Sequence, residues 1–211
     1  MAKRILIMGA TGGTGRSLLE QALDAGHDVT AFVRNPDKVS RHADRLRVVA
    51  GDAATGAPSL SEAMRGQDAV LSTLGRGLSL KSENLMQRSV PHLLAAMQEH
   101  RVRRLIFTSA LGVAETVQDS PLLSRVFQGL FLRGLFADKA AAEALIRRSG
   151  LEWTIVHPAG LTNGPLTRQY RAGERLKLRG FPTISRADTA HFLLSQLDDR
   201  SYIGKVVALA Y

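Results

Sequence analysis

The 211-residue sequence contains no cysteine. A chain without cysteine has no disulfide framework, no thiolate nucleophile and no cysteine-based metal site, which excludes thiol catalysis and zinc ribbons. No group of His, Asp and Glu residues has the spacing of a metal site either, so we expect no metal. The missing cysteines suit a reducing compartment, and we expect a cytoplasmic protein.

Long apolar runs are also missing, since none approaches the roughly 20 residues that a membrane helix needs. The apolar residues 5–8 follow two basic residues, as in a signal peptide, but the run ends at Gly9 and continues into a glycine-rich turn. We therefore interpret residues 5–8 as a buried first strand and expect no membrane association.

Acidic residues are in the minority, with 19 against 28 basic ones and a formal net charge of +9. Such an excess favours an acidic partner, either nucleic acid or a phosphorylated cofactor. The basic residues are dispersed, however, and small groups such as 101–104 and 147–148 fall at expected helix ends, where cations complement the helix dipole. We favour a phosphorylated small molecule over nucleic acid and expect a monomer or a weak dimer.

The dominant pattern is an alternation of β-rich apolar runs with helical periodicity, which builds a parallel sheet covered on both faces. Strands are predicted near 4–8, 28–33, 46–50, 68–73, 103–108, 153–157 and 205–209. Helices are predicted near 13–25, 59–65, 84–99, 138–149 and 186–197. The pattern predicts a single α/β Rossmann-type domain over residues 1–211, doubly wound, with a mostly parallel sheet of about seven strands.

Two segments interrupt the alternation, at 111–136 and 159–185, and both are rich in glycine and apolar residues. Each follows the carboxyl end of a predicted strand, where open α/β sheets bind ligands. We interpret them as insertions that form the walls of a substrate site, with ordinary packing of their apolar residues as the alternative.

A glycine-rich turn directly follows the first strand and opens a helix. Gly9 allows the tight turn, Gly12 lets the backbone approach a pyrophosphate, and Gly15 lets the helix lie close to the sheet. The turn runs through Gly9, Ala10, Thr11, Gly12, Gly13, Thr14 and Gly15. This context predicts a dinucleotide-binding turn.

The residue after the second strand selects between the two nicotinamide dinucleotides. An acidic residue there favours NAD, whereas an arginine accommodates the 2′-phosphate of NADP. Here it is Arg34, and Lys38 adds a second cation. Asp37 is the competing feature, since it can instead face a ribose hydroxyl, but we predict NADPH as the cofactor.

Two further strand ends fall at the same edge of the sheet. Gly51 and Asp52 follow the third strand, while Leu74 and Gly75 follow the fourth. Asp52 either accepts a hydrogen bond from the adenine amino group or caps a local turn, and both alternatives stay open.

The glycine turn, Val33-Arg34, Gly51-Asp52, Thr108-Ser109-Ala110 and Pro165-Leu166-Thr167 together resemble the flavin reductase/biliverdin-IXβ reductase group of atypical short-chain dehydrogenases/reductases. The resemblance runs through almost the whole chain and implies an active-site serine at Ser109. It also implies a set of cofactor contacts at Gly9, Thr11, Gly12, Gly13, Thr14, Arg34, Asp52, Leu74 and Gly75.

Typical short-chain dehydrogenases use a Tyr-x-x-x-Lys pair, in which the lysine lowers the tyrosine pKa so that the phenol exchanges a proton. Lys139 matches the lysine and precedes a helix expected at 140–148, but Leu135 stands at the tyrosine position. A ketone needs a proton at its developing alkoxide, whereas a flavin or tetrapyrrole spreads the added charge. The departure therefore favours a conjugated acceptor.

Three side chains are candidates for the chemistry. Ser109 is expected to donate a hydrogen bond to cofactor or acceptor, Lys139 to bond a cofactor ribose hydroxyl, and His157 to supply a proton. Each has a plainer alternative: a strand-end hydroxyl bonded to backbone, a surface lysine and a packed histidine. The nicotinamide is expected beside Pro158, Ala159 and Gly160.

Two functions follow from these predictions. The first is an NADPH-dependent reductase of a flavin or similar conjugated acceptor. The second is a non-catalytic NADP(H)-sensing regulator that resembles the NmrA-like proteins. A sugar-nucleotide epimerase is disfavoured, because that chemistry generally relies on the tyrosine that position 135 does not supply.

Overall fold

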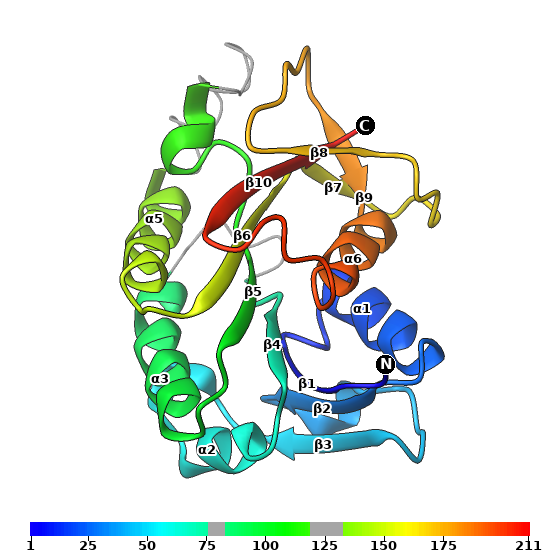
Figure 1. The fold of residues 1–211 in the computed structure, drawn as a ribbon, viewed down its shortest axis with the longest axis vertical. Helices are drawn as coiled ribbons and strands as arrows, with labels where there is room; N and C mark the ends of the chain where they lie inside the picture. The colour runs from blue at the N-terminus through cyan, green and yellow to red at the C-terminus, as the bar shows by residue number, and fades with distance from the viewer. Residues whose placement is uncertain (76–82, 119–132) are drawn as a thin grey trace.

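A twisted sheet of eight strands divides the molecule into two helical layers (Figure 1). The computed structural model describes residues 1–75, 83–118 and 133–211. The strands of this sheet are β1 (Arg4–Met8), β2 (Asp28–Val33), β3 (Leu46–Ala50), β4 (Ala69–Ser72), β5 (Arg104–Thr108), β6 (Glu152–Pro158), β8 (Arg171–Gly173) and β10 (Lys205–Ala210). Their spatial order is β3-β2-β1-β4-β5-β6-β10-β8, and every pairing is parallel except β10 with β8.

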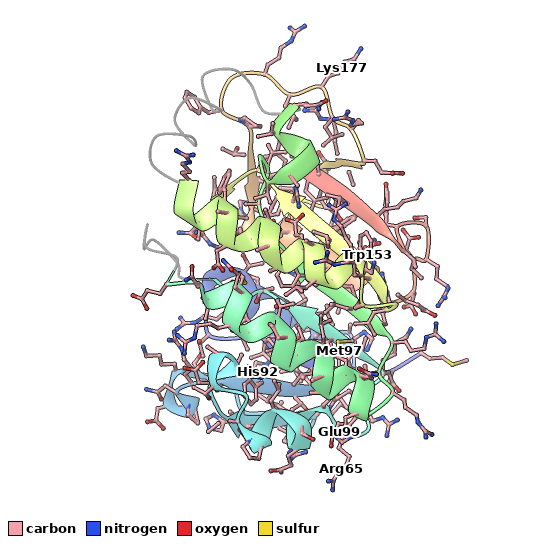
Figure 2. All side chains as sticks on the ribbon, turned by 90° about the vertical axis from the view of Figure 1, so that its left-hand side faces the viewer. Arg65, His92, Met97, Glu99, Trp153 and Lys177 are labelled. Atoms are coloured by element: carbon pink, nitrogen blue, oxygen red, sulfur yellow. The ribbon has the colours of Figure 1, made fainter. Side chains whose placement is uncertain are left out.

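The helices of the described ranges cover both faces of the sheet. They are α1 (Gly13–Asp24), α2 (Pro58–Met64), α3 (Leu85–Glu99), α5 (Arg133–Arg147) and α6 (Arg186–Ser195). Helices α1 and α6 pack together on one face, while α2, α3 and α5 cover the other (Figures 1 and 2).

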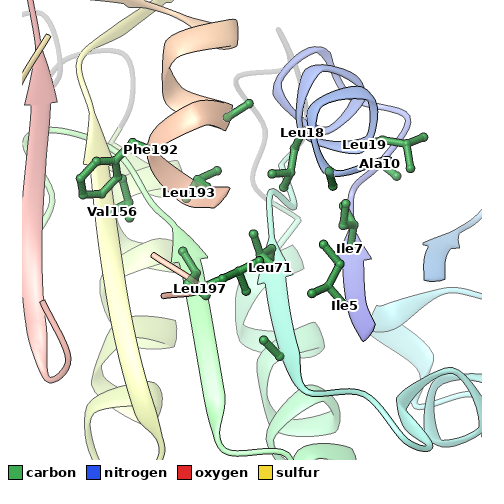
Figure 3. Close-up of a cluster of buried hydrophobic side chains, with 14 of the residues drawn as sticks. Ile5, Ile7, Ala10, Leu18, Leu19, Leu71, Val156, Phe192, Leu193 and Leu197 are labelled. Atoms are coloured by element: carbon green, nitrogen blue, oxygen red, sulfur yellow. The ribbon is translucent and has the colours of Figure 1, made fainter. Parts of the chain in front are cut away.

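Alternation along β1 shows how the sequence fills both layers. Ile5 and Ile7 belong to the core beneath α1 and α6, whereas Leu6 and Met8 belong to the core beneath α2, α3 and α5. All four side chains are fully buried, which is why a parallel strand covered on both faces is a continuous apolar run. Figure 3 shows the core beneath α1 and α6, where the side chains of Leu18 and Leu193 point from these helices toward the strands.

The strand order confirms the predicted doubly wound sheet. The run β3-β2-β1-β4-β5-β6 has the order of a Rossmann domain, in which the chain reverses its direction of winding between β1 and β4. Ligands bind such sheets at the carboxyl ends of the strands flanking this switch point. Gly9 follows β1 and Thr73 follows β4, so the predicted glycine turn stands at this position.

All seven predicted strands and all five predicted helices are present, with three differences. The short edge strand β8 makes the sheet eight-stranded, and β7 (Gly160–Thr162) pairs with β9 (Thr183–Ser185) in a separate two-stranded sheet. Helix α5 begins at Arg133, so the prediction that Lys139 precedes its helix is wrong.

The two predicted insertions have different structures. Within 111–136, the described part contains the 3-10 helix η3 (Ala114–Gln118) and the first turn of α5, while residues 119–132 lie outside the described ranges. The insertion at 159–185 contains β7, β8 and β9. No helix of the described part of the chain has the length and apolar character needed to cross a membrane.

Candidate functional site

The glycine turn is held against the end of β4. Gly9 has φ +84°, a left-handed conformation that favours glycine, and a Cβ there would lie 2.7 Å from the Thr73 carbonyl oxygen. The Thr73 hydroxyl donates to the carbonyl oxygens of Met8, at 3.1 Å, and Gly9, at 3.3 Å. The two strand ends at the switch point are thus fastened together.

Helix α1 starts where the turn folds back on itself. A Cβ on Gly15 would lie 2.0 Å from the Gly9 carbonyl oxygen, so only glycine fits this close approach. The N-cap residue Gly12 contributes no side-chain hydrogen bond, and the first turn contains no acidic residue. The first N–H groups of a helix have no intrahelical partner, and here they are left available to an anion.

These features fit the pyrophosphate of a dinucleotide. Gly12 and Gly13 are exposed, and although the Gly12 N–H donates to the Gly9 carbonyl at 3.0 Å, the positive end of the α1 dipole faces outward beside them. Thr11 is half-buried and Thr14 is buried in the first turn. The predicted phosphate-binding residues of this turn therefore stand together, around a cradle that side chains on the glycines would fill.

Arg34 lies directly after β2, exposed to solvent. Its guanidinium has no hydrogen-bond or ion-pair partner in the described ranges. The next residues form the 3-10 helix η1 (Pro36–Lys38), in which the Asp37 backbone N–H donates to the Asn35 side chain at 2.9 Å. Arg34 is thus a cation without a partner in residues 1–75, 83–118 and 133–211, at the strand end where the adenosine ribose of a dinucleotide lies in Rossmann domains.

Asp52 caps a turn in this structure. Its carboxylate accepts from the Ala54 backbone N–H at 2.9 Å and starts the 3-10 helix η2 (Ala53–Thr55). An adenine contact from this carboxylate stays a prediction. At the end of β4, Leu74 is half-buried and Gly75 is exposed with open space around it, since a Cβ on Gly75 would meet nothing within 4 Å.

A buried polar cluster stands on the α5 side of the sheet edge. The Ser109 hydroxyl donates to Glu143 Oε1 at 2.5 Å, and His157 Nε2 lies 2.9 Å from the same oxygen. The other ring nitrogen of His157 lies 2.8 Å from the Thr116 hydroxyl. Arg147 Nη2 approaches Glu143 Oε2 at 3.4 Å. Glu143 is therefore the centre of the cluster.

This arrangement constrains two of the predicted catalytic residues. The single hydroxyl hydrogen of Ser109 is used by Glu143, so in this conformation Ser109 offers a ligand its lone pairs rather than a donor. His157 is completely buried with both ring nitrogens engaged. A proton from His157 therefore reaches a ligand only through one of its two partners, Glu143 or the Thr116 hydroxyl. Burial raises the pKa of Glu143, but hydrogen bonds from His157 and Ser109 and the charge of Arg147 outweigh it, so the net pKa lies below its usual value.

Lys139 lies one helical turn before Glu143 on α5 and is only 8% exposed. Its ammonium has no hydrogen-bond partner in the described ranges, and burial lowers the pKa of Lys139 to about 8, against the opposing charges of Glu143 and Asp138. Asp138 is itself committed, because its carboxylate accepts from the backbone N–H groups of Met86 and Gln87 at the start of α3. A surface lysine, the plainer alternative, does not match this burial.

The strand ends beyond Ser109 supply the remaining predicted contacts. Pro158 ends β6, Ala159 is buried and bonded to the Leu209 carbonyl at 2.9 Å, and Gly160 is exposed. The buried hydroxyls of Ser72 and Thr108, at the ends of β4 and β5, have no hydrogen-bond partner among the residues that the structure describes. Unsatisfied polar groups at a sheet edge are those that a bound ligand or water completes.

The three tyrosines stand elsewhere. Tyr170 bonds His191 at 2.7 Å, Tyr202 contacts Phe192, and Tyr211 bonds Asp188 at 2.7 Å. These partners belong to α6, on the opposite face of the sheet from α5. Leu135 occupies α5 one turn before Lys139, as the spacing predicts. The Tyr170 bond gives His191 a structural role on α6.

Glu143, the residue with the most contacts in the cluster, was not among the functional side chains predicted from the sequence. Its separation of four residues from Lys139 places both on one face of α5, and that spacing was the available signal. The sequence did not reveal how deeply Glu143 is buried, because that burial depends on β6, which places His157 opposite Glu143.

Comparison with known proteins agrees with this geometry. The family model described as NAD(P)H-binding matches residues 9–200. A chloroplastic protein of Arabidopsis thaliana is 31% identical over 177 residues, covering 78% of this chain and 61% of its own length. A protein named reductase pytE, from Aspergillus terreus, is 27% identical and covers 98% of this chain and 97% of its own length.

Solved structures show the same fold. A Rossmann-fold NAD(P)-binding protein from Shigella flexneri has a TM-score of 0.73 at 27% identity, covering 99% of this chain and 93% of its own. A wide-type short-chain dehydrogenase/reductase from Veillonella parvula, solved with NADP, has a TM-score of 0.82 at 19% identity, covering 100% of this chain and 95% of its own. The anaerobilin reductase ChuY of Escherichia coli O157:H7 has a TM-score of 0.80 at 23% identity, covering 98% and 96%.

Proposed function

The chain belongs to the NAD(P)H-binding family, and from that premise we propose that it is an NADPH-dependent reductase of a flavin or a similarly conjugated acceptor. The observation that carries the proposal is the glycine turn fastened to the end of β4, with the uncapped start of α1 beside it. The bound dinucleotide supplies the hydride. The chain supplies the binding surface, the orientation and the electrostatics.

Arg34 supports NADPH over NADH. A guanidinium can form paired hydrogen bonds with the phosphate that distinguishes the two dinucleotides. In this chain the Arg34 guanidinium is exposed and has no partner in the described ranges, so it needs to break no contact before binding a 2′-phosphate. No acidic side chain occupies position 34, where a carboxylate would favour the 2′-hydroxyl of NADH.

Position 135 supports a conjugated acceptor. Leucine exchanges no proton, so an acceptor that spreads the added electrons over a ring system suits this site better than an isolated ketone. Lys139 adds to this argument, because at neutral pH its buried ammonium is largely protonated and favours negative charge nearby. Ser109, with lone pairs free to accept, would orient a donor on cofactor or acceptor.

The names of two relatives point to different chemistries. The fungal protein aligned over nearly the whole chain is named a reductase. A Bacillus subtilis protein that is 27% identical over 203 residues is named a sugar epimerase. Redox turnover therefore has to be measured for this chain itself.

The test is anaerobic oxidation of NADPH with FMN, FAD, riboflavin, biliverdin and simple quinones, each offered to the wild-type protein and to Ser109→Ala. We expect turnover with at least one acceptor and a clear loss in the variant. Ser195→Ala is the matched control, because its hydroxyl lies at the far end of α6, where it donates to the Phe192 carbonyl at 2.8 Å and accepts from the Gln196 amide at 3.2 Å.

A non-catalytic NADP(H) sensor is the second candidate. It is favoured by one observation, namely that Leu135 and the engaged Ser109 hydroxyl leave no free proton donor among the predicted catalytic side chains except Lys139. Saturable NADPH binding with no oxidation above the buffer rate, for any acceptor, would replace the reductase with the sensor.

A further inference from the structure

Arg186 lies across the start of helix α1, although it comes from α6. It is the first residue of α6, and a Cβ placed on Gly13, the first residue of α1, would lie 2.6 Å from Arg186 Cδ and 2.7 Å from Arg186 Nε. The space beside the glycine turn is therefore occupied by the side chain of an arginine that is distant in sequence. A side chain at position 13 would collide with Arg186, which favours glycine there.

The guanidinium is held in place from one side only. Arg186 Nη1 donates to the Asn163 side-chain oxygen at 2.7 Å and to the Leu161 carbonyl oxygen at 3.4 Å. Its Nε and Nη2 groups have no hydrogen-bond partner within the described ranges. Two N–H donors on adjacent nitrogens form the edge with which arginine binds phosphate in a bidentate manner.

The position is electrostatically unfavourable without an anion. The N-terminal end of a helix carries partial positive charge, so a cation there is disfavoured, and Arg186 stands at the start of both α1 and α6. The first turn of α1 contains no acidic residue. Asp188, in the first turn of α6, turns its carboxylate to Thr167, Arg168 and Tyr211 instead.

No carboxylate lies within ion-pair distance of Arg186 in the described part of the chain. Arg186 is a half-buried residue with two N–H groups unpartnered in the described ranges, and it lies beside the uncapped start of α1, an arrangement that binding of an anion would complete. The anion that this turn would bind is the pyrophosphate of the dinucleotide.

We propose that Arg186 binds the dinucleotide pyrophosphate together with the N-terminus of α1. The inference rests on the dinucleotide site of the proposed function and adds a residue to it. Because the pyrophosphate is common to both dinucleotides, Arg186 contributes equally to NADPH and NADH, unlike Arg34. Asn163, on the segment after β7, acts as the positioning residue that aims the guanidinium.

Isothermal titration calorimetry of the full-length protein with NADPH and with NADH tests the proposal. A hydrogen-bonded contact to a charged group is worth about 1.5–3 kcal/mol, so Arg186→Ala should weaken both dinucleotides by the same factor, roughly 10- to 100-fold. Arg34→Ala should weaken NADPH alone. Arg65→Ala removes the same charge at the amino ends of the strands and should change neither affinity, because Arg65, labelled in Figure 2, lines a pocket with Arg4 and Asp28, the first residues of β1 and β2.

Two further variants keep the test valid if Arg186→Ala unfolds. Arg186→Lys keeps the charge without the bidentate edge, and Asn163→Ala keeps the arginine but frees it. Both should weaken NADPH and NADH in parallel and by less than Arg186→Ala, with unchanged thermal unfolding of the ligand-free protein.

Unchanged affinity in all three variants would overturn the inference and leave the proposed function intact. A loss confined to NADPH would also overturn it, because Arg186 would then contact the 2′-phosphate. If the wild-type protein bound neither dinucleotide, the proposed function would be contradicted and this inference with it.

Discussion

Replacing Glu143 with glutamine should destabilise the protein much more than the same change at an exposed ion pair. Glu143 is 1% exposed and accepts hydrogen bonds from Ser109 and His157 through one oxygen, while Arg147 faces the other. Glutamine removes the charge and puts an amide N–H₂ where an acceptor stood, so one donor has to face another donor. The expected defect is therefore electrostatic, with the volume of the side chain preserved.

The size follows from the burial. Removing one partner of a buried pair typically costs about 3–5 kcal/mol, and glutamine keeps one acceptor oxygen, so we expect a loss of about 3 kcal/mol. Glu174 is the matched control, because it lies 2.9 Å from Lys205, the same separation as Glu143 from His157, but its side chain is 54% exposed. Glu174→Gln should cost less than about 1 kcal/mol.

Urea unfolding followed by the fluorescence of Trp153 measures both variants. Trp153 is the one tryptophan of the sequence and lies near Arg147, whose guanidinium carbon is 5.7 Å from its ring centre. With an m-value of about 2 kcal/mol per M, the midpoint of Glu143→Gln should fall by about 1.5 M. Equal midpoints for the two glutamine variants would refute the argument from burial.

The contribution of Glu143 to stability should also depend on pH. The pKa of Glu143 is lowered in the folded protein from an ordinary value of 4.5, so its contribution is present above that pH and is lost as the pH falls through the folded pKa. The stability gap between wild type and Glu143→Gln should therefore narrow on acidification below about pH 4.5. A gap that stays constant down to the acid transition would contradict a charged Glu143.

Three other predictions concern separate parts of the site. Arg34→Ala should weaken NADPH binding by roughly 10-fold or more and leave NADH unchanged, and equal losses in calorimetry would contradict the choice of NADPH. Gly15→Ala should weaken dinucleotide binding at least about 10-fold, because its Cβ would lie 2.0 Å from the Gly9 carbonyl oxygen; Gly134→Ala, with open space around it, is the control. The buried Lys139 ammonium destabilises the folded protein until it loses its proton. The unfolding free energy of wild type relative to Lys139→Met should therefore rise by about 3 kcal/mol between about pH 8 and pH 10.5. A difference in unfolding free energy that does not change with pH would show that the ammonium is solvated.

Sequence patterns predicted the main sheet because its central parallel strands β1, β4 and β5 are covered on both faces and are nearly continuous apolar runs. The three-residue strands β7, β8 and β9 carry no such run, and their pairing depends on partners far along the chain, as β8 shows with β10. The early start of α5 at Arg133 was missed because glycine at position 134 disfavours a helix.

The residues of the candidate site likewise fall into those that local sequence spacing predicts and those that it does not. Residues of the glycine turn and the strand ends follow from local spacing, because a Rossmann switch point fixes where they stand. Glu143 and Arg186 do not, since each depends on a tertiary contact that local spacing does not predict: α5 with the ends of β5 and β6 in one case, and α6 with the start of α1 in the other.

Hydride transfer itself is tested most directly by NADPH deuterated on one face of the nicotinamide at a time, mixed anaerobically with the protein and its best acceptor. Mass spectrometry of the NADP⁺ formed then shows which face lost its label. A reductase should remove the label from one face and retain it on the other, because a nicotinamide ring held in the site presents one face to the acceptor. Loss of label from both faces alike, or NADPH that is bound but never oxidised, would contradict a reductase.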